Sequence, residues 1–102
     1  MNDSTQMYLL KLRVESSLYD ELTDQLLAFP ARALDFVAMP INRHHGDLRT
    51  MNERVSGYQS GYEFQVECSL EECEQIDRMI QQQIHTSNYE LSITPMIQPH
   101  WR

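Results

Sequence analysis

Hydrophobic and polar residues alternate along four short stretches of the chain, a period that is typical of β-strands with one buried face. The third stretch shows the pattern most clearly, because Glu63, Gln65 and Glu67 separate its apolar positions. Those apolar positions are Tyr62, Phe64, Val66 and Cys68. We therefore predict four strands, which cover residues 7–14, about 33–39, 61–68 and 89–94.

Two other stretches carry apolar residues at three- and four-residue steps, the spacing of an amphipathic helix. The first begins after the first strand, with Ser17 as its expected N-cap, and Pro30 is expected to end it. The second follows the third strand, where Ser69 and Glu72 have the S-x-x-E spacing of a capping box. The apolar stripes are Leu18, Leu22, Leu26 and Phe29 in the first helix, and Cys73, Ile76, Met79, Ile80 and Ile84 in the second.

The element order β-α-β-β-α-β predicts a single α+β domain over residues 1–102, a ferredoxin-like sandwich. In this fold the antiparallel four-stranded sheet has the order 4-1-3-2 and both helices lie on one face. Charge supports the pairing of strands 1 and 3, because Lys11 and Arg13 would then stand across from Glu63, Gln65 and Glu67 on the outward face. We expect the second strand to end at Pro40, which lacks an amide hydrogen. The outward sheet face would be polar apart from Leu9, either solvated or closed on copies of the chain.

Charge and composition narrow the class of protein. The formal net charge is −7, which argues against nucleic-acid binding and against binding to an anionic membrane surface. Residues 1–6 lack the features of a signal peptide, and no apolar run approaches the roughly 18–20 residues of a membrane span. We therefore expect a cytoplasmic protein without direct membrane insertion, whose Cys68 and Cys73 are reduced core residues.

The connection between the second and third strands, residues 41–60, is unusually long, because hairpin loops usually have about 2–5 residues. It holds three of the eight basic residues of this acidic chain. Loops on a rigid scaffold commonly carry recognition, so we predict a partner-binding loop, either ordered or ordering on contact. Its candidate binding residues are Arg43, His44, His45, Gly46, Asp47, Arg49, Glu53, Arg54 and Gly57. Residues 95–102 would form a C-terminal tail.

Short motifs around this connection resemble a known family. They are Phe36, Met39-Pro40-Ile41, His45-Gly46, Leu48 and Glu53-x-Val55-x-Gly57. With the element order, they are similar to an uncharacterised bacterial family of PII-like proteins, related to the nitrogen regulatory protein PII and to CutA. Members are often encoded beside heavy-metal efflux systems. The resemblance covers about residues 7–96.

The resemblance implies a homotrimeric signalling protein whose long connection, the T-loop of PII proteins, contacts a protein partner. It carries over to His45, Gly46, Glu53 and Gly57. PII proteins hold ATP with a Gly- and Lys-rich loop before the last strand, whereas residues 85–88 here contain neither glycine nor lysine. ATP binding of the usual kind is therefore not expected, and the cofactor is unknown. Tyr58 is one residue out of register with the modified T-loop tyrosine, so that modification is not transferred.

Metal binding is a different hypothesis for the same segment. His44 and His45, with Asp47 and His100, offer ligands suited to divalent zinc, copper or nickel. On this alternative the protein is a metal-binding accessory of heavy-metal cation efflux. The competing interpretation is that these are solvated loop histidines, and a further alternative is an interaction scaffold without a small ligand.

Catalysis is not predicted. Asp47 and Glu53 form a carboxylate pair, but nothing in the pattern places them in a pocket, as acid–base catalysis requires. The sequence has no nucleophile elbow and no phosphate-binding glycine run. A cysteine nucleophile would need exposure, which the expected burial of both cysteines denies.

Overall fold

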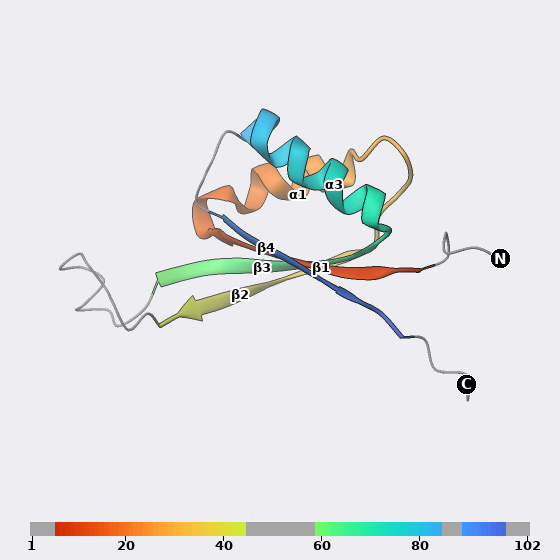
Figure 1. Ribbon diagram of the computed structural model, residues 1–102. Coiled ribbons are helices and arrows are strands. Elements are labelled where there is room, and N and C mark those ends of the chain that lie inside the picture. Colours follow the sequence, from red (N-terminus) through yellow and green to blue (C-terminus); the bar gives the residue numbers. More distant parts are fainter. Residues whose placement is uncertain (1–5, 45–58, 85–88, 98–102) are drawn as a thin grey trace.

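The computed structural model describes residues 6–44, 59–84 and 89–97. Four strands and two main helices alternate in the predicted order (Figure 1). The strands are β1 (Tyr8–Glu15), β2 (Phe36–Arg43), β3 (Gln59–Cys68) and β4 (Tyr89–Pro95). The helices are α1 (Tyr19–Leu27), preceded by the 3₁₀ turn η2 (Ser16–Leu18), and α3 (Leu70–Met79), continued by the π turn η3 (Ile80–Ile84).

The strands form one antiparallel sheet in the order β2-β3-β1-β4. Figure 1 shows α1 and α3 together on one side of this sheet. The α+β ferredoxin-like prediction and the order 4-1-3-2 are therefore confirmed. The register also confirms the charge argument, since Lys11 pairs with Gln65 and Arg13 pairs with Glu63.

The core lies between the helices and the sheet. Alternate residues of β1 and β3 that face the helices are buried, namely Leu10, Leu12, Val14, Phe64, Val66 and Cys68. The helices contribute Leu22, Leu26, Cys73, Ile76, Ile80 and Ile84. Both predicted apolar stripes thus reach the core, except that Leu18 and Met79 are half-buried at its margin.

The predicted ends of the first helix are wrong. Ser17 does not cap α1, because η2 comes first and the Ser17 hydroxyl donates a hydrogen bond to Glu15 Oε1 at 2.8 Å. The helix ends at Leu27, before Pro30, although Phe29 is still buried beyond the helix end.

The predicted limits of the second strand are also wrong, because β2 begins at Phe36 and continues through Pro40 to Arg43. The physical reason is that β2 is an edge strand. On an edge, alternate amides point away from the sheet, so a residue without an N–H is tolerated there. Leu34 is buried as expected but precedes the strand.

The start of α3 is built as the sequence predicts. The Ser69 hydroxyl accepts a hydrogen bond from the Glu72 amide at 3.1 Å, and Glu72 Oε1 accepts one from the Ser69 amide at 2.9 Å. Arg32, in the segment between α1 and β2, forms a bidentate ion pair with Glu72. Its Nε and Nη2 donate to the two Glu72 carboxylate oxygens at 2.6 and 2.8 Å. Arg32 Nη2 also donates to the Glu67 carbonyl at 3.2 Å, so Arg32 connects the segment before β2 with the end of β3 and the start of α3.

Some predicted features fall on residues 45–58, 85–88 or 98–102, which lie outside the described residues. They include the tight connection expected at 86–88 and most of the tail. Within the part of the chain that is described, none of the helices has the length and apolar character needed to cross a bilayer.

Candidate functional site

The sheet face that points away from the helices carries polar and charged side chains from all four strands, with Leu9, Val37 and Met39 among them. This assignment follows from strand alternation, because the neighbouring positions are buried against the helices. The predicted polar outer face is therefore present, and it carries more exposed apolar surface than Leu9 alone provides. Val37 is 55% exposed and Met39 is 36% exposed.

Glu63 is the centre of a hydrogen-bonded group on this outer face. Its Oε1 accepts from Arg13 Nε at 2.8 Å and its Oε2 accepts from Gln65 Nε2 at 2.7 Å. Glu63 is only 7% exposed, although it lies on the side of the sheet opposite α1 and α3. The hydrogen bond from Arg13, followed by the one from Gln65, lowers the pKa of Glu63 below its ordinary value. The side chain is therefore a fixed carboxylate at neutral pH.

A second ion pair fixes the start of the long connection. Arg43, the last residue of β2, donates from Nη2 to Glu90 Oε2 at 2.7 Å. Glu90 belongs to β4, at the opposite edge of the sheet, and its Oε1 lies 3.9 Å from Arg13 Nη1. The β3 residue that faces outward between Arg43 and Glu90 is Gly61, which has no side chain. The Arg43 side chain is thus held by the carboxylate of Glu90, a residue that follows the 85–88 connection in the sequence.

Two of the predicted loop residues are described. Arg43 ends β2 and is half-buried, and His44 follows it and is exposed. The other predicted positions lie outside the described residues: His45, Gly46, Asp47, Arg49, Glu53, Arg54 and Gly57. The residue of this candidate site that the sequence interpretation missed is Glu90. The alternation of residues in the last strand was the available signal, because it places Glu90 on the outer face. The contact with Arg43 could not be predicted in this way, because it depends on how the sheet is twisted.

The metal hypothesis rests mainly on residues that are not described. His45, Asp47 and His100 are among them. Within residues 6–44, 59–84 and 89–97, no group of three or more His, Cys, Asp or Glu side chains is arranged to hold a metal ion.

Cys68 and Cys73 are buried core residues, as predicted, and both are free thiols. Their Sγ atoms are 3.2 Å apart across the junction of β3 and α3. Burial is the largest cause that raises the pKa of both thiols. They are neutral at physiological pH, which makes them poor nucleophiles.

Comparison with known proteins identifies the family. The family described as "Protein of unknown function (DUF3240)" matches residues 4–99. The chain belongs to the DUF3240 family. A search of curated proteins gave no match.

Solved structures show the same fold over most of this DUF3240 chain. A DUF3240 protein from Shewanella baltica superposes with a TM-score of 0.71 and 15% identity, covering 92% of this chain and 93% of that one. A protein described as PII-like and signalling, from Thermus thermophilus, gives 0.59 and 16%, covering 90% of each chain. Bacillus subtilis GlnK, solved with ATP, gives 0.55 and 12%, covering 89% of this chain and 84% of its own. The fold is therefore PII-like, as the resemblance implied.

Proposed function

We propose that this DUF3240 protein is a non-enzymatic regulatory binding module of the cytoplasm, which assembles as a homotrimer and contacts a partner protein through the 41–60 connection. The observation that carries the proposal is the PII-like fold over about nine-tenths of the chain, shared with a protein described as PII-like and signalling and with GlnK. That likeness supports a regulatory role by analogy of fold.

The position of the long connection supports its use as a contact surface. It leaves β2 after Arg43 and rejoins the neighbouring strand β3 at Gln59, so both of its ends lie at one end of the sheet (Figure 1). The Arg43–Glu90 ion pair gives this end a defined geometry. A rigid base under a long connection is the arrangement that recognition loops commonly use.

The outer sheet face supports self-association. Val37 and Met39 expose apolar surface beside the Arg13–Glu63 pair, and both helices of the described residues lie on the other side of the sheet (Figure 1). Apolar residues surrounded by polar, already paired groups are typical of interface cores. We therefore assign the subunit contact to this face.

Sedimentation equilibrium at several protein concentrations tests the trimer. The expected result is a mass three times that of the 12.1 kDa chain. Val37→Arg should shift the protein towards the monomer, whereas Leu27→Arg should not. Leu27 is the matched control, since it is 68% exposed on α1 and lies on the helix side. A monomer at all concentrations, or equal effects of the two variants, would refute the assembly.

Site-specific photo-crosslinking in cells tests the role of the connection. A photoreactive residue at position 49 should give a discrete crosslinked partner. The same residue at Asp20, an exposed position in the first turn of α1, should not. Identical products from both positions would contradict a specific contact.

A further inference from the structure

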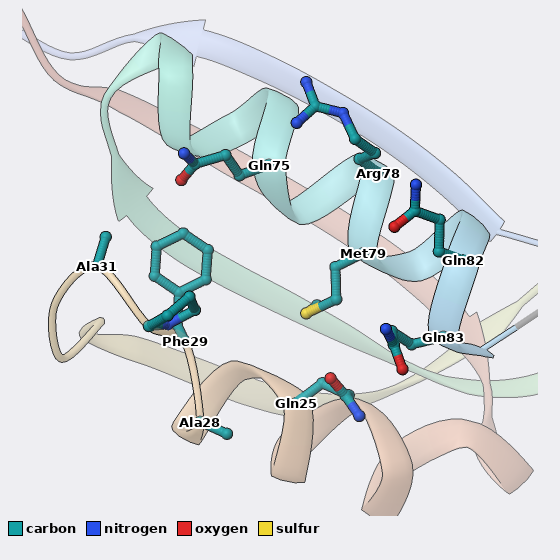
Figure 2. Close-up of a pocket in the computed structure, with 10 residues that line it drawn as sticks. Gln25, Ala28, Phe29, Ala31, Gln75, Arg78, Met79, Gln82 and Gln83 are labelled. Atoms are coloured by element: carbon teal, nitrogen blue, oxygen red, sulfur yellow. The ribbon is translucent and has the colours of Figure 1, made fainter.

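A groove of about 520 Å³ lies on the helix side of the molecule, between α1 with the segment after it and α3 with η3. Figure 2 shows Met79 pointing from α3 towards α1, with Phe29 beside it. At one end of the groove, Gln25 and Gln83 approach each other from the two helices, while the side chains of Arg78 and Gln82, at the margin of the groove, extend away from α1. The volume is within the range of small-molecule sites, roughly 300–1,000 Å³.

The groove is built by a second stripe of α3, which meets the core-facing stripe at Met79 on the core margin. Ile76, Ile80 and Ile84 face the sheet. The residues that line the groove from this helix occur at steps i, i+3, i+4, i+7 and i+8: Gln75, Arg78, Met79, Gln82 and Gln83. The last two belong to the π turn η3. Because a π turn has more residues per turn than an α-helix, successive side chains diverge less, and π turns are frequent at functional sites.

The polar side chains of the groove have unused hydrogen-bonding capacity. Within the described part of the chain, neither Arg78 nor the glutamines at 25, 82 and 83 make a side-chain hydrogen bond or ion pair. The neighbouring acid Asp77 is engaged elsewhere, because its Oδ1 accepts from the Tyr89 hydroxyl at 2.7 Å and its Oδ2 accepts from Gln81 at 3.4 Å. Arg78 is the one charged residue among those that line the groove.

We infer that this groove binds a small organic carboxylate with an apolar body. The apolar body packs on Phe29 and Met79, and the carboxylate pairs with the Arg78 guanidinium, which suits planar bidentate acceptors. The glutamine amides, which both donate and accept, satisfy any further polar groups of the ligand. Apolar lining combined with a few polar groups is the usual composition of a ligand site.

Charge favours a carboxylate over a phosphate. The chain carries a net charge of −7, and α3 itself bears Glu71 and Glu74. A single arginine balances a monoanion, whereas a dianion would keep an excess charge in this acidic surrounding. The inference does not rest on the proposed function, because the groove lies on the opposite side of the sheet from the outer face.

Amide chemical-shift titration of the full chain tests the inference, with phenylacetate and 4-methylpentanoate as anionic probes and phenylacetamide as the neutral analogue of the first. Saturable shifts are expected at residues 25–31 and 75–83. Phenylacetate should bind about three- to fivefold more tightly than phenylacetamide, because only the anion forms a charge-assisted pair with Arg78, and Arg78 is exposed.

Two variants isolate the role of the arginine. Arg78→Gln should remove the preference for phenylacetate and leave phenylacetamide binding unchanged. Lys11→Gln makes the same change in net charge on the outer sheet face, so it should keep the preference. Shifts that are undisturbed away from the substituted residue verify folding of each variant. The inference is overturned if neither anion gives saturable shifts in the groove by about 10 mM, a concentration that would detect millimolar binding. It is equally overturned if the preference survives Arg78→Gln or disappears in Lys11→Gln.

Discussion

Replacing Glu72 by glutamine should lower the free energy of unfolding by about 1 kcal/mol while leaving α3 capped. Glutamine can still accept the hydrogen bond from the Ser69 amide, since either Glu or Gln completes a capping box. It loses the negative charge that Arg32 contacts through two nitrogens at 2.6 and 2.8 Å. The substitution therefore separates the ion pair from the cap.

The magnitude follows from the exposure of the two partners. The Glu72 side chain is 13% exposed, but the Arg32 side chain is 41% exposed. Exposed ion pairs contribute about 0.2–1 kcal/mol, and bidentate geometry places this one at the upper end. Ser69→Ala, which removes the cap and keeps the pair, should cost about 0.5–2 kcal/mol. Glu72→Ala removes the ion pair and the hydrogen bond from the Ser69 amide but keeps the bond from its own backbone amide to the Ser69 hydroxyl, so it should cost more than Glu72→Gln.

Urea unfolding at neutral pH, with a double-mutant cycle of Glu72→Gln and Arg32→Gln, measures the pair directly. For a domain of this size, a loss of 1 kcal/mol lowers the melting temperature by about 4–8 °C. Hydrogen bonding to Arg32 is the largest cause that lowers the pKa of Glu72 below 4.5. A depressed carboxyl pKa stabilises the fold above the unfolded-state value, so the advantage over Glu72→Gln should shrink as pH falls below about 4.5. It should vanish below the folded-state pKa. A coupling near zero, or a difference that grows in acid, would refute the assignment.

Four further predictions concern the core and its edges. Phe64→Ala should cost about 3–5 kcal/mol in urea unfolding, because Phe64 is fully buried, and wild-type stability in that variant would contradict its central place. Gly61→Ala should cost about 1–3 kcal/mol, since an added Cβ would lie 2.5 Å from the Val14 carbonyl oxygen; a neutral effect would mean that β1 and β3 separate easily. Tyr89→Phe should cost about 1 kcal/mol by removing the hydrogen bond to Asp77, and an unchanged melting temperature would argue against that bond. Cys68 should resist a thiol reagent in the native protein and react once urea unfolds it, whereas prompt native labelling would contradict its burial.

Much of the fold could be predicted because it depends on local patterns. The alternation around Phe64 places β3, and the capping box at Ser69 and Glu72 marks the start of α3. The sheet order required one longer-range argument, the opposition of Arg13 and Glu63, which the register confirms. These features follow from residues a few positions apart or from charges on facing strands.

The wrong predictions share one cause, which is that each applied a local rule where tertiary context decides. Pro40 does not end β2, because the strand is at an edge where one missing amide costs little. Ser17 does not cap α1, because the turn after β1 is 3₁₀ and the hydroxyl bonds to Glu15. A sequence window contains neither the position of a strand in the sheet nor the geometry of the turn before a helix.

The features that carry the functional proposals also depend on tertiary context. Arg43 and Glu90 are far apart in sequence and belong to opposite edge strands, so only the twist of the assembled sheet brings them into contact. The groove likewise depends on how far α1 and α3 stand apart over the core, which neither helix specifies alone. Its residues do leave a trace in the sequence, because Arg78 and Gln82 continue a polar stripe that no core contact requires. A helix with two stripes, one apolar and buried and the other rich in amides with a single cation, has a face that the fold itself does not need. Such a face is where a ligand site costs the least stability, and this is the physical reason to look for one there.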